Sequence, residues 1–273
     1  METIINYFNT IPSSHRSLLL VGGIALFWII ENAFPFFKFQ YNKIQHARIN
    51  IFFTITSIAV NFVLAFVLLK ISAFTVQNNF GILHLLPKIN FWVFMLFGLL
   101  LLDFIGAFLP HFVEHRIKFL WRFHLIHHTD TWVDTTSANR HHPGESVIRF
   151  AFTAIGVLLV GAPMWLVFLY QSLSVIFSQF NHANISISKK IDTIMSYIFV
   201  SPDMHKVHHH YKLPYTDSNF GNIFSVWDRI FGTFKTLNRN EIVYGLDTHL
   251  DTKENNNLKN LLNIPFQQIR SLQ

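Results

Sequence analysis

Cysteine is absent from this chain of 273 residues, and charged residues make up only 13% of it. Without cysteine the chain forms no disulfide, no thiolate iron–sulfur centre and no cysteine-ligated zinc site, so any metal must be bound by nitrogen and oxygen atoms. Ordinary soluble domains carry about 25% charged residues. Low charge together with a hydrophobic share of 51% indicates an integral membrane protein.

A secretory signal is also lacking. The first 16 residues have no basic start followed by a short apolar core and a cleavage site, so we expect no leader peptide. The net charge of +6 does not point to nucleic acid, because the basic residues are scattered along loops beside apolar runs. That distribution is typical of membrane proteins that follow the positive-inside rule.

Long apolar runs are plentiful, at 18–34, 51–69 and 91–109, with an uncharged run at 150–180. As one helix the last run would measure about 46 Å, which exceeds a hydrocarbon core of about 30 Å. Gly161-Ala162-Pro163 interrupts it, which favours a helical hairpin. We therefore predict an all-α integral membrane protein with about four transmembrane helices, the last two forming a hairpin.

Lysine and arginine predict the orientation. They gather in the loop after the first span and in the stretch after the third, at Lys38, Lys43, Arg48, Arg116, Lys118, Arg122 and Arg140. Three spans place both stretches on one side, and their charge assigns that side to the cytosol. A hairpin at 150–180 would return the chain there, so the histidine-rich segments would meet in a cytosolic helical cap.

Histidine is the most informative residue type, since twelve of the 16 histidines lie between positions 111 and 210. Three segments, HFVEH, HLIHH and HKVHH, carry helical spacing, at His111 and His115, at His124, His127 and His128, and at His205, His208 and His209. Residues three and four apart share one face of a helix. Together these faces offer enough nitrogen ligands for two metal ions.

Four segments in this order resemble the fatty acid hydroxylase superfamily, which includes sterol desaturases and alkylglycerol monooxygenase: DFIGAFLPHFVEHRIKFLWRFHLIHH, NRHHPGE, QFNHANI and SPDMHKVHHHYKLPYTDSNFGNIFSVWDRIFGTF. The resemblance covers roughly residues 95–235. It implies a membrane enzyme with a non-haem di-iron centre that uses O2 to hydroxylate or desaturate lipids. It assigns the ligand role to the eight histidines above and to His182. Phe112 departs from the pattern, because many relatives have arginine there.

The same resemblance implies the partners. A lipid substrate (sterol, fatty acyl chain or ether lipid) would enter from the bilayer, and zinc would be a possible substitute for iron in purified protein. Because the chain has no cysteine and no visible haem-binding domain, electrons would come from a ferredoxin, or from a cytochrome with its reductase. The chain would divide into a transmembrane region 1–110, a catalytic region 111–235 and a polar tail 236–273.

Neutral histidines leave the charge of two metal ions uncompensated, so we expect supporting polar side chains nearby. A carboxylate inside an apolar span is costly, which makes Asp103 a functional candidate, although a structural hydrogen bond would also explain it. Glu145 lies close to the histidine segments in sequence, and Asn181 is next to His182. We predict Asp103, Glu145 and Asn181 as catalytic side chains. For His142 we expect a structural role near the site, and we expect His210 to lie outside it.

Two alternatives use the same histidines. A pH sensor built from titrating imidazoles would not need the same spacing twice. A histidine-rich metal transporter or metal-binding protein without oxygenase activity would place its ligands at mid-membrane on broken helices. The histidine segments lie outside the long apolar runs, so the sequence favours the oxygenase.

Overall fold

A computed structural model describes residues 1–268, and within that range it contains helices and isolated β-bridges but no strand. The long helices are α2 (Ser13–Ala33), α3 (Lys43–Gln77), α5 (Phe91–Asp103), α8 (Pro143–Val160) and α9 (Met164–His182). The shorter ones are α1 (Glu2–Asn9), α4 (Ile82–Leu85), α6 (Leu109–Arg116), α7 (Lys118–His128), α10 (Lys189–Met195), α11 (Pro202–His208), α12 (Val226–Ile230), α13 (Thr252–Asn255) and α14 (Leu258–Asn263). The prediction of an all-α fold is confirmed.

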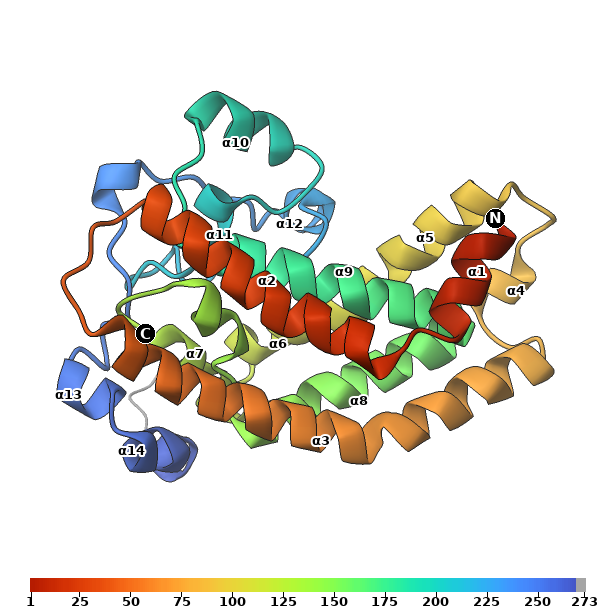
Figure 1. Ribbon diagram of the computed structural model, residues 1–273, viewed down its shortest axis with the longest axis horizontal. Helices are drawn as coiled ribbons and strands as arrows, with labels where there is room; N and C mark the ends of the chain where they lie inside the picture. Colours follow the sequence, from red (N-terminus) through yellow and green to blue (C-terminus); the bar gives the residue numbers. More distant parts are fainter. Residues whose placement is uncertain (269–273) are drawn as a thin grey trace.

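Four segments of the described chain are long and apolar enough to cross a membrane, in agreement with the expected number: Ser13–Ala33, Lys43–Leu85, Phe91–Arg116 and Pro143–Val160. In Figure 1, α3 runs along one side of α8, and α2 lies along α9. Helix α9 has 19 residues but is not among the four segments. A membrane hairpin made by α8 and α9 therefore stays a prediction.

The expected helix break at residues 161–163 is present. Gly161 ends α8 in the left-handed conformation, with φ at 73°, and Pro163 immediately precedes the first turn of α9. A β-carbon at Gly161 would come within 2.4 Å of the Phe80 carbonyl oxygen, so this position requires glycine for space as well as for φ. The chain reverses here, at the right-hand end of Figure 1.

The third apolar segment extends further than the run 91–109 predicts. Helix α5 continues through a π-helical turn, Phe104–Phe108, into α6, so Phe91–Arg116 is one helical rod. Pro110 has no backbone N–H and would disturb a regular α-helix, but the wide turn just before it relaxes the hydrogen-bond ladder. The first histidine box is therefore the end of this rod and not part of a separate polar loop.

The core lies between α5, α8 and α9, and a second apolar cluster lies under α7. Leu261 and Ile264, near the end of the described chain, are fully buried against Trp121 and Leu125 of α7. Described residues of the region expected to be a polar tail thus cover the back of a histidine-bearing helix.

Candidate metal centre

All nine predicted ligands meet at one end of the helical body. They come from α6, α7, the last residue of α9, and α11 with its C-terminal flanking residue, and these elements converge on the left of Figure 1. Ser201 starts α11 by accepting a hydrogen bond from the Met204 backbone N–H, and Pro202 occupies the first turn. None of the nine rings is more than 6% exposed.

The nine rings form two clusters. In each cluster every histidine offers one ring nitrogen, and these nitrogens all lie within 4.8 Å of one another. The first cluster has five members, His111, His115, His124, His128 and His208, and the second has four, His127, His182, His205 and His209. The two clusters are neighbours, since the rings of His128 and His209 stack with centroids 4.9 Å apart.

Each HxxHH box serves both clusters. In α7 the i, i+4 pair His124 and His128 enters the five-histidine cluster, while His127 enters the four-histidine cluster. In the third box the i, i+4 pair His205 and His209 enters the four-histidine cluster, and His208 enters the other. Residues four apart differ by about 40° around a helix and adjacent residues by about 100°. The doubled histidine at the end of each box thus connects the two clusters.

Burial keeps these imidazoles neutral. It lowers the pKa of His128 and of His208 well below the usual range, and neighbouring histidines lower both further. Burial also lowers the pKa of His182 to about 3. At neutral pH the rings therefore keep a free lone pair, which is the form of histidine that binds metals.

The hydrogen bonds around the five-histidine cluster fit a metal site. Three rings donate the Nδ1 proton to oxygens of one loop, His111 to the Phe220 carbonyl at 2.8 Å, His115 to the Asp217 carboxylate at 3.0 Å and His208 to the Ser218 carbonyl at 2.7 Å. The Nε2 atoms of the same three rings are buried without a hydrogen-bond partner. Ligating histidines have this arrangement, with one nitrogen fixed by an acceptor and the other free for the ion.

The ring nitrogens of the four-histidine cluster also lie close enough together to bind one ion. His182 donates its Nδ1 proton to the Ser178 carbonyl at 2.7 Å, and its Nε2 lies 3.0 Å from His127 Nε2 and 2.9 Å from His205 Nε2. In one tautomer His127 or His205 donates its Nε2–H to the His182 lone pair, and in the other tautomer their Nε2 lone pairs are free for an ion. Imidazole nitrogens bind a metal such as zinc at about 2.0–2.1 Å, so nitrogens on one ion come this close together.

Glu145 supports the histidines through hydrogen bonds. It accepts the Nδ1 proton of His124 at 2.7 Å and the Arg149 Nε–H at 2.8 Å, and His141 Nδ1 lies 2.8 Å from the same carboxylate oxygen. The ring of His141 stacks on His127 at 4.7 Å, so the carboxylate contacts one cluster directly and the other through a neighbour. The sequence predicts no role for His141, because this residue is not part of an i, i+3 or i, i+4 pair of histidines.

Replacing Glu145 with glutamine should weaken metal binding at the five-histidine cluster by about 10–100-fold, because a neutral amide oxygen accepts the His124 Nδ1–H more weakly than a carboxylate does. Titration of the metal-free protein with Fe(II) against a coloured chelator measures the affinity. The exposed Glu241→Gln variant is the matched control, since Glu241 accepts its hydrogen bonds from Asn238. Equal affinities in both variants would contradict the supporting role.

Asp103 does not contact the clustered histidines in the described structure. Its carboxylate accepts the backbone N–H groups of Ile223 and Phe224 and the indole N–H of Trp227, each at 3.2 Å. These are structural hydrogen bonds of the kind considered for it above. Its catalytic role stays a prediction.

Asn181 donates its amide to the Asn222 carbonyl at 2.8 Å, and its side-chain oxygen is buried without a partner. It is next to His182 and fixes the end of α9 to the same loop. His142 lies at the start of α8, where its ring accepts the Gly144 N–H, and His210 accepts the Val243 N–H, outside both clusters.

The loop at 217–224 is the feature that sequence reasoning did not assign. Asp228 shapes it by accepting the backbone N–H groups of Phe220 at 2.7 Å and Gly221 at 2.9 Å. Asp103 holds the next turn of the same loop, and the loop oxygens in turn orient His111, His115 and His208. In the sequence this loop is marked by the DSNFG segment, but the segment does not indicate which distant residues bind to it.

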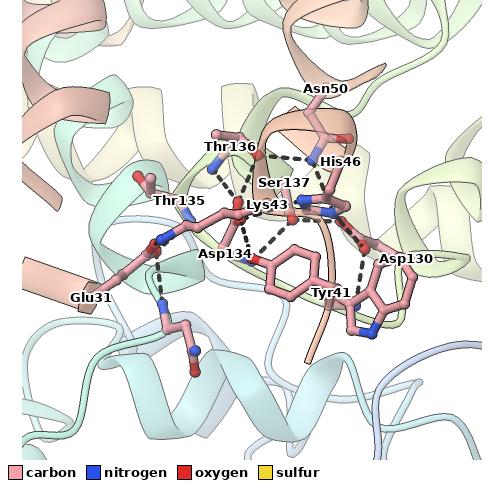
Figure 2. Close-up of polar contacts among 12 residues, drawn as sticks. Glu31, Tyr41, Lys43, His46, Asn50, Asp130, Asp134, Thr135, Thr136 and Ser137 are labelled. Atoms are coloured by element: carbon pink, nitrogen blue, oxygen red, sulfur yellow. Dashed lines mark hydrogen bonds and ion pairs between the residues drawn. The ribbon is translucent and has the colours of Figure 1, made fainter. Parts of the chain in front are cut away.

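A buried polar network joins α3 to the segment that follows His128 (Figure 2). His46 Nε2 is 2.9 Å from the Asp130 carboxylate, and His46 Nδ1 is 3.3 Å from Asp134. Tyr41 donates its hydroxyl proton to Asp134 at 2.8 Å. Burial alone would raise the pKa of Asp130, but His46 and Arg140 hold it well below the usual range. Asp130 follows His128 by two residues, so the network fixes the chain just after the second box.

Glu31 extends this network to the end of α9. It accepts the backbone N–H of Thr135 at 2.6 Å and that of Asn184 at 2.9 Å, and it pairs with Lys43 at 2.9 Å. Figure 2 shows Glu31 and Lys43 on one side of the network and His46 on the other. The segments that follow His128 and His182 are therefore fixed by residues of α2 and α3.

Fold and site define a class, a multi-pass α-helical membrane protein with nine buried histidines in two adjacent clusters. The chain belongs to the fatty acid hydroxylase family, because the model of that family, described as "Fatty acid hydroxylase", matches residues 95–233, about half of the chain. All nine clustered histidines lie inside the matched range.

Curated relatives include ornithine lipid hydroxylase OlsE of Rhizobium tropici, which is 27% identical over 50% of this chain and 40% of its own length. Alkylglycerol monooxygenase of Caenorhabditis elegans is 30% identical over 59% of this chain and 30% of its own length. Cholesterol 25-hydroxylase-like protein of Danio rerio is 27% identical over 50% of this chain and 53% of its own length. The alignments thus span only part of each relative. No solved structure matches the chain.

Proposed function

We propose that this protein is a membrane-bound non-haem di-iron oxidoreductase that uses O2 to hydroxylate or desaturate a lipid. One observation carries the proposal: two adjacent clusters of buried imidazoles, several with an unpartnered ring nitrogen, lie in a chain of the fatty acid hydroxylase family. The rings are held in place by a loop, by Glu145 and by the end of α9. Fixed ligands suit a permanently bound ion better than an ion that is transported.

The metal is proposed as a pair of iron ions, one in each cluster, with zinc as a substitute in purified protein. Neutral imidazole binds iron, zinc and copper, so availability and geometry select among them. Bound iron would supply O2 activation at an unactivated C–H bond, which protein side chains do not provide. The chain itself contributes nine neutral ligands and the carboxylate of Glu145, and it excludes water by burying every ring.

The substrate is proposed as a lipid with a long apolar part: a sterol, a fatty acyl chain or an ether lipid. The relatives carry names that refer to ornithine lipid, alkylglycerol and cholesterol, which differ in headgroup but are all lipids. His111 and His115 belong to the apolar rod Phe91–Arg116, so a lipid tail would reach the five-histidine cluster from the bilayer. Hydroxylation gives an alcohol, and loss of two hydrogens gives a double bond.

The remaining assignments follow from the sequence. The histidine clusters would face the cytosol, because lysine and arginine gather beside them. The division into 1–110, 111–235 and 236–273 is retained as a proposal. Glu145 would act by holding the proton on His124 Nδ1, Asn181 would position His182, and Asp103 would act through the 217–224 loop. Electrons would come from a separate ferredoxin or cytochrome with its reductase.

The test is oxidation of lipids with isotopically labelled oxygen. Iron-loaded protein in lipid nanodiscs would be given 18O2, a chemical reductant and a mixture of sterol, fatty acyl and ether lipids. Mass spectrometry should find one 18O atom in a product lipid, or the loss of two hydrogens, and neither in a His208→Ala/His209→Ala variant. Iron-loaded, reduced protein that oxidises none of these lipids and consumes no O2 would refute the proposal.

A further inference from the structure

A hydrogen bond between His115 and Asp217 connects the five-histidine cluster to a cavity at the protein surface. His115 donates its Nδ1 proton to Asp217 at 3.0 Å, and the Asp217 side chain is 24% exposed. Asp217 lines a surface cavity of about 370 Å³ together with Arg116, Leu213, Pro214, Gly232, Thr233 and Lys235. The path from the surface to a ring of the cluster is therefore a single carboxylate.

The other rings of this cluster are shielded more deeply. The hydrogen-bond partners of His208 and His124 are Ser218 and Glu145, and that of His111 is Phe220; all three partners are fully buried. Arg149, whose side chain is 26% exposed, reaches His124 through Glu145, whereas Asp217 lines a surface cavity and bonds a ring of the cluster directly. Asp217 and His115 therefore give electrons a short route from this cavity to the cluster along bonded and hydrogen-bonded atoms.

The rim of the cavity is cationic. Arg116 and Lys235 line it, and Asp217 is the single carboxylate among its described lining residues. Lys212 is exposed and directly precedes Leu213, which is 45% exposed. A small anion inside the cavity would meet the Asp217 carboxylate, whereas acidic side chains of a protein can pair with the rim cations and leave Asp217 uncovered.

We propose that this cavity and its rim, defined by Arg116, Leu213, Pro214, Asp217 and Lys235, are the docking surface of an acidic one-electron-donor protein. The inference rests on the proposed function.

Hydroxylation consumes O2, two protons and two electrons besides the substrate C–H bond, and it yields an alcohol and water. Two donor molecules would each give up one electron, and the metal pair would accept both electrons. Redox partners of this kind use small, charged, transient interfaces.

The test uses a plant-type [2Fe–2S] ferredoxin with net negative charge as the probe, and an Arg116→Glu/Lys235→Glu variant. In stopped-flow experiments on the iron-loaded protein, the second-order rate of ferredoxin oxidation should fall at least about tenfold at low ionic strength. The difference should disappear at high salt, because screening removes the steering. In the metal-free protein, the Kd for oxidised ferredoxin should rise by a similar factor.

Two controls separate docking from folding and from chemistry. A Lys88→Glu/Lys259→Glu variant makes the same change in charge at exposed positions outside this surface and should behave like the parent. Reduction of the iron by dithionite should be equally fast in all three proteins. An unchanged ferredoxin rate and Kd in the Arg116→Glu/Lys235→Glu variant would refute the docking surface. The docking surface would also be refuted if this variant lost binding to anionic-lipid vesicles while its ferredoxin rate and Kd stayed the same. Failure of the parent to accept electrons even from dithionite would refute the proposed function instead.

Discussion

Replacing His115 and His208 together with alanine is expected to lower the bound metal from about two ions per chain to about one. Both rings belong to the five-histidine cluster, and removing them leaves three ligands there while the four-histidine cluster stays complete. Replacing His205 and His209 should remove the other ion. Fewer imidazoles weaken an N-ligand site strongly, because each ligand contributes to a binding free energy of order 10 kcal/mol. Elemental analysis of protein purified under low oxygen measures the metal content.

Variants across the clusters make this prediction sharper. A His208→Ala/His209→Ala variant removes one ligand from each cluster, so both ions should be bound more weakly. A His15→Ala/His84→Ala variant removes two histidines outside the clusters and should keep the full metal content. If each pair within one cluster removed both ions, the nine rings would form one indivisible centre, and the division into two clusters would be wrong.

Replacing His46 with leucine should be among the most destabilising single changes, at about 3–5 kcal/mol. His46 is 1% exposed and lies between the carboxylates of Asp130 and Asp134. Without the imidazole, two buried carboxylates lose a positive partner and face each other. The thermal unfolding of metal-free protein in detergent should shift to a clearly lower temperature, independently of any effect on metal binding.

A second substitution tests the cause. Adding Asp130→Asn to His46→Leu removes one of the uncompensated charges, and part of the lost stability should return. His15→Leu serves as the control, because His15 is exposed and its ring forms a hydrogen bond with Tyr7, which is not part of this network. A His46→Leu variant that unfolds at the parent's temperature would show that the network of Figure 2 does not stabilise the protein.

Local periodicity explains what the sequence could predict. The i, i+3 and i, i+4 spacing of histidines depends only on helical geometry, so eight of the nine rings that the structure brings together could be named from spacing. The ninth, His182, has no such spacing and was named only from the family resemblance. Apolar runs gave the number of membrane-type segments for a similar reason. The assignment of rings to clusters was out of reach, because it depends on how α6, α7, α9 and α11 face one another.

Long-range hydrogen bonds explain what the sequence could not predict. Asp103 and Ile223 are 120 positions apart, and His46 and Asp130 are 84 positions apart. Nothing in the local pattern of either residue specifies its partner. The cost of a carboxylate in an apolar span correctly marked Asp103 as important, but the reason became visible only with the loop that it holds.

The π-helical turn at Phe104–Phe108 sets the rotational phase of the rod that carries the first histidine box. Asp103 and His111 are eight positions apart, which in a regular α-helix would separate their directions by about 80°. A π turn absorbs one residue, so the pair behaves as if seven positions apart and returns to within about 20° of one direction. Both side chains consequently reach the same loop, Asp103 at Ile223 and His111 at Phe220. The fold therefore depends more on the number of residues in this turn than on their identity. Substituting an aromatic residue there should disturb the site less than deleting one residue.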